Sequence, residues 1–340
     1  MEVYIMRRSK YILFILMAVM VLFTGCVKKY KENNNNIEKV SIEYKVVKFE
    51  IPDPDDAFIE QQIVTKNDAN DLIEEKLYRI HNGVIYRIVQ VNLKTVVWGI
   101  QKLEYPYENW DTTIISAEEW YEGRIYELYD CTIAPNGVIK LVLSEEYQGK
   151  RYYDLSEWRA GSILSCKDIT EQYEKITFKD HEWYIDGIGN HYFFNEQSLM
   201  VYNMLFRERE DYAIEGTIDD IVLNNNNEAF FAGMLKKGVY KGLYKTADRE
   251  PAFWEEILKA APDTEPHYVW DKNNDILVID KEHISKIGYE LSRVYSFSEA
   301  DLSLEEIHGI IYYNDAIYLL GTENQDDILL LISEKEKTDL

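Results

Sequence analysis

The chain has 340 residues, of which 46% are hydrophobic and 14% aromatic, and its formal net charge is −24 at pH 7. This apolar content is sufficient for a packed core and excludes a disordered chain. The 61 Asp and Glu against 37 Lys and Arg argue against nucleic acid as a partner, because phosphate binding needs clustered basic side chains.

The N-terminus has the layout of an export signal. Arg7, Arg8 and Lys10 form a basic patch, and the apolar stretch 11–23 follows and leads through two small residues to Cys26. A basic region, an apolar region and small residues in this order are typical of signal peptides. The apolar run is shorter than the roughly 20 residues that a membrane-spanning helix needs.

The end of this segment resembles the lipobox of bacterial lipoproteins, with Phe23 where that family usually carries Leu. The resemblance implies that residues 1–25 are a cleaved signal peptide and that Cys26 carries a diacylglycerol thioether. Two acyl chains anchor a protein more firmly than one. We therefore expect a protein bound to the cell membrane and facing its extracytoplasmic side.

Residues 26–40 are polar and include four successive asparagines. Such a stretch cannot bury enough apolar surface to order itself, so it is predicted to be a flexible tether after the lipidated cysteine. Residues 41–340 are then the folded domain.

That domain repeats one pattern, in which two apolar strands flank a tight turn. Asn82-Gly83 and Asn136-Gly137 are the strongest turn signals, because Asn-Gly supplies the positive φ values of a two-residue hairpin. The other predicted turns lie at 187–190, 224–227, 271–274 and 314–315.

The six turns recur at intervals of roughly 37 to 54 residues, which brackets the length of a four-stranded propeller blade. We therefore predict an all-β fold, a β-propeller of six or seven irregular blades, in which the early strand 42–50 closes the ring as the fourth strand of the last blade. The alternative is a pair of two-sheet β-sandwich domains. One helix is expected at 252–261, after Pro251.

Contiguous catalytic motifs are lacking, including the G-x-S-x-G elbow, the P-loop and H-E-x-x-H. Adjacent carboxylates such as Asp219-Asp220 are expected by chance in so acidic a chain. The segment 271–275 matches the opening of a calcium loop, but Ile276 stands where that loop needs Gly. His181 and His191 face each other in the third hairpin but have no third ligand. We therefore expect no metal, no cofactor and no enzymatic activity.

Two cysteines remain after Cys26. Export would permit a disulfide between Cys131 and Cys166, and a pair of buried free thiols is the alternative.

Aromatic residues are the better indication of a ligand-binding surface. Exposed aromatic side chains stack on sugar rings or contact peptides, and the alternative explanation is packing between blades. The candidate ligand-binding residues are Tyr105, Tyr107, Trp110, Trp120 and Trp158.

As a whole, the lipobox, the polar tether and the tyrosine-rich repeats resemble surface lipoproteins of Gram-positive bacteria. In some of these a similar repeat region precedes the solute-binding domain of an ABC importer. The resemblance implies a binding or scaffold lipoprotein that recognises a glycan, a peptide or another envelope protein, accessory to an importer. The alternative is an extracytoplasmic propeller enzyme that acts on carbohydrate, which requires carboxylates or histidines converging on the propeller axis.

Overall fold

The computed structural model describes part of the chain, in segments separated by short gaps. The described residues are 38–41, 44–54, 73–92, 96–116, 127–159, 162–173, 181–195, 198–203, 205, 207–214, 216–226, 228–235, 241–246, 254–259, 265–279, 284–287, 293–296, 302 and 304–334. Within these segments, no helix combines the length and apolar character needed to cross a membrane.

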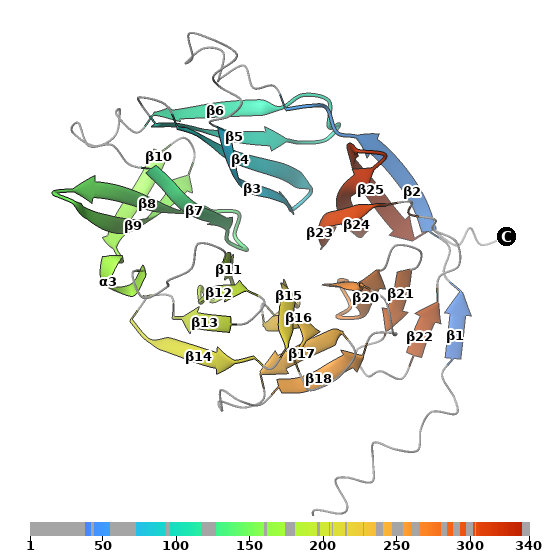
Figure 1. Ribbon diagram of the computed structural model, residues 1–340. Helices are drawn as coiled ribbons and strands as arrows, with labels where there is room; N and C mark the ends of the chain where they lie inside the picture. The colour runs from blue at the N-terminus through green and yellow to red at the C-terminus, as the bar shows by residue number, and fades with distance from the viewer. Residues whose placement is uncertain are drawn as a thin grey trace, which may run out of the picture.

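Six sheets stand side by side around a common axis, each with its first strand innermost (Figure 1). Blade 1 contains β3 (Ile73–His81), β4 (Val84–Asn92), β5 (Val96–Leu103) and β6 (Asp111–Ser116); blade 2 contains β7 (Glu127–Ile133), β8 (Ile139–Tyr147), β9 (Lys150–Arg159) and β10 (Ser162–Asp168); blade 3 contains β11 (Glu182–Ile185), β12 (His191–Asn195), β13 (Ser198–Tyr202) and β14 (Arg209–Ala213).

The second half of the ring repeats this order. Blade 4 contains β15 (Thr217–Leu223), β16 (Ala229–Met234), β17 (Gly242–Thr246) and β18 (Trp254–Lys259); blade 5 contains β19 (His267–Trp270), β20 (Ile276–Ile279), β21 (Ile284–Ile287), β22 (Arg293–Ser296) and β1 (Glu38–Ser41); blade 6 contains β23 (Glu306–Tyr313), β24 (Ala316–Glu323), β25 (Asp326–Glu334) and β2 (Tyr44–Glu50). The predicted β-propeller is confirmed, with six blades, and the sandwich alternative is wrong.

The core consists of six apolar clusters, one between each pair of neighbouring blades. Alternate residues of a strand point to opposite faces of its sheet, so each blade supplies two clusters. On β12, Phe193 packs toward blade 2, whereas Tyr192 and Phe194 pack toward blade 4. Both faces of every blade are therefore buried, which explains the high aromatic content.

The predicted turns are confirmed in position, and each joins the innermost strand of a blade to the second. The blade 2 turn is longer than the two residues expected, because the Ala134 amide donates to the Val138 carbonyl, and only Gly137 has a positive φ there. Asn82 and Gly83 have φ values of 49° and 76°, and Asn314 and Asp315 have 48° and 61°, as a two-residue hairpin requires. All six turns lie on the same side of the ring, which we call the turn face.

Blades 3, 4 and 5 use a longer turn that a side chain closes. Asp186, Asn224 and Asp271 open these turns, and the Oδ1 atom of each accepts hydrogen bonds from the amides two and four residues later. Asp and Asn favour such turns because their side chains reach their own backbone.

Strand β2 closes the ring, as predicted from the early apolar segment. It pairs antiparallel with β25, from Tyr44 opposite Glu334 to Glu50 opposite Ile328. Strand β1 adds a fifth strand to blade 5 by pairing parallel with β22. The first described strands thus lie against the last two blades.

The helix expected at 252–261 is wrong. Residues 254–259 form β18, the outermost strand of blade 4, and pair with β17. Helix propensity is a weak preference that tertiary context overrides, and blade 4 needs a fourth strand at this point. The described residues instead include a short helix that was not predicted, α3 (Thr170–Tyr173).

The two remaining cysteines lie in the same blade but do not form a disulfide. Cys131 is on β7 and Cys166 on β10, the innermost and outermost strands of blade 2. Three interstrand spacings separate these strands by roughly 14 Å, whereas bridged Cα atoms lie within about 7 Å. Cys131 is a buried free thiol.

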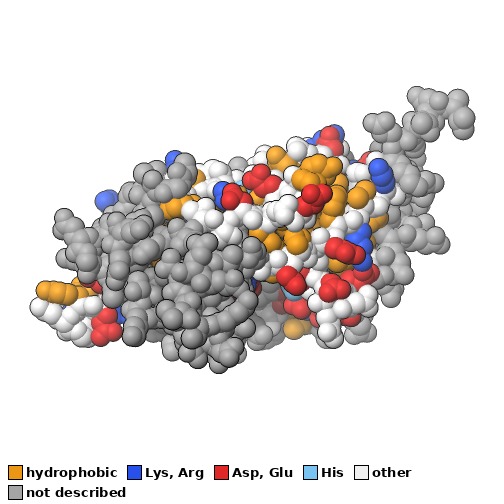
Figure 2. Space-filling model, turned by 90° about the horizontal axis from the view of Figure 1, so that it is seen from above, with side chains coloured by type: hydrophobic (Ala, Val, Ile, Leu, Met, Phe, Trp, Pro, Cys, Tyr) orange, Lys and Arg blue, Asp and Glu red, His pale blue; other side chains and the backbone are white. Residues whose placement is uncertain are grey.

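Figure 2 shows acidic side chains scattered over one side of the molecule among apolar and uncharged groups. A net charge far from zero that is spread in this way opposes self-association.

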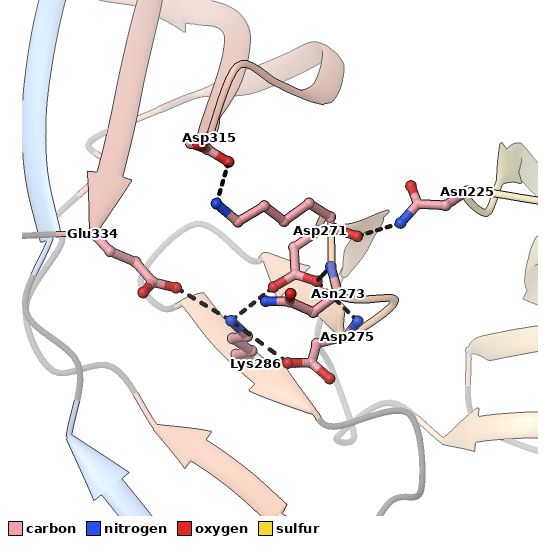
Figure 3. Close-up of polar contacts among 8 residues, drawn as sticks. Asn225, Asp271, Asn273, Asp275, Lys286, Asp315 and Glu334 are labelled. Carbon is pink, nitrogen blue, oxygen red and sulfur yellow. Dashed lines mark hydrogen bonds and ion pairs between the residues drawn. The ribbon is translucent and has the colours of Figure 1, made fainter.

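A buried ammonium group connects blades 5 and 6 (Figure 3). The Nζ atom of Lys286 lies 2.7 Å from Asp271 Oδ2, 3.6 Å from Asp275 Oδ2 and 3.2 Å from Glu334 Oε1. Lys286 is 8% exposed and Asp271 only 2%, so water screens this pair weakly. Asn225 of blade 4 extends the network by donating to the Asp271 carbonyl at 2.6 Å.

Replacing Lys286 with Met tests this network. The change leaves the Asp271 carboxylate buried without its cation, so we expect a loss of about 3 kcal/mol in the free energy of unfolding, measured by urea denaturation. The matched control is Lys272→Met, which removes an exposed pair with Asp315 and should cost less than about 1 kcal/mol. Equal losses in the two variants would contradict a special role for the buried pair.

Candidate functional site

Three acidic residues occupy the same position on the inner strands of successive blades. Asp130, Glu182 and Asp220 each lie four residues before the residue that opens the hairpin turn of blades 2, 3 and 4. They stand on β7, β11 and β15. Each of these strands is the innermost of its blade, so the repeat places the three residues on strands that surround the axis (Figure 1).

Two of these residues follow a β-bulge. The pairing register shifts between Leu128 and Asp130 and between Ile218 and Asp220, so each strand carries one extra residue there. Bulges re-aim side chains and free backbone groups from the ladder. The freed amides donate to the carboxylates, from Cys131 to Asp130 at 2.8 Å and from Ile221 to Asp220 at 2.7 Å.

The charge of Arg79 on β3 acts on all three carboxyl groups. It lowers the pKa of Asp130, Glu182 and Asp220 against the effect of burial. Blades 1 and 4 lie opposite each other in a six-bladed ring, so the interaction between Arg79 and Asp220 crosses the axis. We call Arg79, Asp130, Glu182 and Asp220 the axial cluster.

The guanidinium of Arg79 donates a hydrogen bond of 3.3 Å to the Thr132 hydroxyl on β7. Among the described residues, no carboxylate lies within ion-pair distance of it, and its side chain is half-buried. A half-buried cation that lacks a close counter-ion is available to an anionic group or a developing negative charge.

Burial favours the uncharged, protonated forms of the acidic residues in the cluster. Loss of water raises the pKa of Asp130 and of Asp220 to about 7, and Glu182 adds to the rise at Asp220. The pKa of Glu182 is raised less, and this side chain is exposed. Asp130 also accepts a hydrogen bond of 3.0 Å from the Tyr173 hydroxyl.

The axial cluster can therefore act as an acid–base site. Carboxyl groups with pKa values near neutral pH serve both as proton donors and as proton acceptors, and strongly perturbed values concentrate at functional sites. Arg79 adds a fixed positive charge to the same space. In the part of the chain that the structure describes, no three His, Cys, Asp or Glu side chains are placed to hold a metal ion.

The aromatic residues predicted to bind a ligand lie apart from this cluster. Tyr105 is 75% exposed, but Tyr107 is buried and donates a hydrogen bond of 2.7 Å to the Gly83 carbonyl. Trp110 is half-buried and donates to the Pro52 carbonyl at 2.8 Å. Trp158 is buried between blades 1 and 2. Cys26 and Trp120 lie outside the described residues.

The other sequence motifs have structural roles. The segment 271–275 is a hairpin turn, and the Lys286 ammonium occupies the place beside Asp271 that a cation would take in a calcium loop. His181 and His191 do not face each other, because Ile185 is opposite His191, whereas His181 precedes the other end of β11. His191 instead accepts a hydrogen bond of 3.1 Å from the Trp183 indole.

Sequence reasoning missed the axial cluster, although a signal for it exists. Aligning the chain on its six turns places acidic residues at one position in three successive blades. The adjacency of Asp219 and Asp220 carries no information in so acidic a chain. The informative feature is that Asp220 lies four residues before the turn residue Asn224. Arg79 has no such signal, because its partners are three distant strands.

Comparisons with known proteins give similar folds but no family. No family model matches the chain, and no curated protein resembles it significantly. A solved structure of a luciferin-regenerating enzyme has 9% identity and a TM-score of 0.43 over 77% of this chain and 91% of the other. A gluconolactonase from Xanthomonas campestris has 7% identity and a TM-score of 0.40 over 73% and 90%. The β-propeller domain of Cps50 (Swd1) from Myceliophteria thermophila has 8% identity and a TM-score of 0.39 over 76% and 99%.

The prediction that the chain is not an enzyme does not stand, because it rested on the lack of contiguous motifs alone. A propeller collects its site from separate blades, so a contiguous motif is not required.

The raised pKa values predict that stability falls as pH rises. The unfolded chain releases the protons of Asp130 and Asp220 near pH 4, whereas the folded chain holds them to about 7. The free energy of unfolding should therefore decrease between about pH 4 and 7.

The variant Asp220→Asn should reduce this decrease, since the amide keeps an acceptor for the Ile221 amide but does not ionise. Urea denaturation at about pH 5 and 8 measures the effect. The exposed residue Glu146 supplies the control Glu146→Gln, which changes the net charge equally. If both variants reduce the pH dependence of the free energy of unfolding to the same extent, the overall charge of the chain causes it and the axial cluster does not.

Proposed function

We propose that the chain is a propeller enzyme whose axial cluster catalyses acid–base hydrolysis of a carbohydrate. The observation that carries this proposal is the interaction across the axis between Arg79 and Asp220, in a cluster where two carboxyl groups have pKa values near 7. Converging axial carboxylates are the feature that separates an enzyme from a binding module with an aromatic rim.

The cluster supplies the groups that hydrolysis of a sugar ester or lactone needs. Glu182, the exposed and most readily ionised carboxylate, takes a proton from water, whose oxygen attacks the carbonyl carbon. The carbonyl electron pair moves to its oxygen, where Arg79 stabilises the negative charge. The oxyanion electron pair then re-forms the carbonyl double bond as the carbon–oxygen bond to the leaving alkoxide breaks, and a neutral Asp220 or Asp130 donates its proton to that alkoxide.

The surroundings of the cluster support a hydroxylated substrate. Thr132 on β7 and Tyr184 on β11 add hydroxyl groups at neighbouring inner-strand positions, and Asp220 raises the pKa of Tyr184. Hydroxyl and carboxyl groups in alternation form hydrogen bonds with the vicinal hydroxyls of a sugar.

Replacing Asp220 with Asn tests the catalytic role. We expect kcat/KM to fall by about 10²- to 10³-fold on the sugar lactones or esters that the wild-type chain hydrolyses, because proton transfer is lost while shape is kept. The test measures turnover of a panel of lactones, acetylated sugars and aryl glycosides. Glu146→Gln is the control and should keep full activity. Absence of turnover on the whole panel, or full activity of Asp220→Asn, would contradict the proposal.

We also propose that this enzyme is displayed outside the cell on a lipid anchor at Cys26. The support is the basic patch, the apolar stretch and the small residues before Cys26, which resemble a lipobox. The lipid bilayer would then be the partner of the N-terminus, and the substrate would be an extracytoplasmic carbohydrate.

A Cys26→Ala variant tests the anchor. Without the thiol no thioether can form, so we expect the protein to move from the membrane fraction to the soluble fraction when expressing cells are fractionated. Its thermal unfolding should match that of the wild-type domain. A Cys131→Ala variant, which alters a buried thiol of the domain, should stay in the membrane fraction. Retention of Cys26→Ala in membranes would exclude the lipid anchor.

A further inference from the structure

A positively lined cavity lies at the interface of blades 1 and 2. Its volume is about 290 Å³, and its lining includes two cations and no carboxylate. This is unusual in a chain with 61 acidic and 37 basic residues. The lining residues are Tyr86, Lys102, Thr113, Asn136, Gly137, Val138, Ile139, Trp158 and Arg159.

The cations of this cavity keep a net positive charge. The Lys102 ammonium lies over the Tyr86 ring, 5.5 Å from its centroid, and forms no ion pair among the described residues. Arg159 Nη2 lies 3.1 Å from Glu157 Oε2, but Glu157 also pairs with Lys140. One carboxylate therefore serves two cations, and Lys102 adds a third positive charge that forms no ion pair among the described residues.

The base of the cavity is aromatic and rigid. Trp158 is 8% exposed and Tyr86 is 9% exposed, and both belong to the apolar cluster between blades 1 and 2. Trp158 is fixed opposite Ile139 by the pairing of β8 and β9. An ordered aromatic side chain offers a flat apolar surface at little cost in conformational entropy.

Polar groups complete the lining. The side chains of Thr113 on β6 and Asn136 in the blade 2 turn are exposed. A hydroxyl and an amide supply both donors and acceptors for ligand hydroxyls. The volume is at the lower end of the range for ligand pockets, which favours a ligand of one ring.

We propose that this cavity binds a single sugar that carries an anionic group, a carboxylate or a phosphate. The sugar ring packs on the aromatic base, its hydroxyls bond to Thr113 and Asn136, and its anionic group lies between Lys102 and Arg159. Charge-assisted hydrogen bonds to Lys and Arg are the strong contacts of such a site. The cavity uses the outer strands of blade 1 and the turn of blade 2, so it is separate from the axial cluster and does not depend on the proposed catalysis.

Calorimetric titration of the full chain with glucuronate, glucose 6-phosphate and glucose tests this proposal. We expect at least one of the two anionic sugars to bind at least tenfold more tightly than glucose. The comparison between them identifies carboxylate or phosphate as the preferred anion. Lys102→Gln should weaken that binding about tenfold, whereas Lys102→Arg, which keeps the charge, should retain most of it.

The control is Lys150→Gln, which removes an exposed cation at the other end of β9 and should leave binding unchanged. Thr113→Val, an isosteric change at an exposed position, should weaken binding without altering thermal unfolding. Three results would overturn the proposal: glucose binding as tightly as the anions, neither anion binding, or equal losses in Lys102→Gln and Lys150→Gln.

Discussion

Closure of the ring is the constraint on which the rest of this structure depends. Each blade is a four-stranded sheet with two apolar faces, and a sheet of this kind is stable only when both faces are covered. In a closed ring every blade covers its two neighbours. The pairing of β2 with β25 supplies the last strand, and the cluster of Ile80, Ile85, Leu320 and Leu329 between blades 6 and 1 is buried.

The same closure creates the axial cluster. Arg79 and Asp220 are far apart in the sequence and on opposite blades, and only a complete ring points both toward one axis. Bulges at the inner strands then turn Asp130 and Asp220 to accept freed amides. Burial raises their pKa values, which lowers stability at neutral pH. Such a loss of stability at a group of converging side chains is typical of functional sites.

Local environment, rather than overall charge, decides the chemistry at each site. The chain is strongly acidic, yet two of its carboxyl groups hold protons near neutral pH, and the charged residues that line one interblade cavity are both cations. Elsewhere a buried cation is surrounded by carboxylates: the Lys286 ammonium lies beside those of Asp271, Asp275 and Glu334. Composition therefore gives the overall charge of the chain, but it does not locate a site.

By itself, the sequence determined the strands and their turns. Asn82-Gly83 and Asn136-Gly137 specify hairpins through local φ preferences, and the recurrence of such turns predicted a propeller and its closure by an early strand. These features are readable because they depend on neighbours in the chain. Only the tertiary structure decided that there are six blades, that 254–259 is a strand, and that the charge of Arg79 acts on carboxyl groups from three other blades. Those outcomes depend on pairing between distant segments, which no local pattern records.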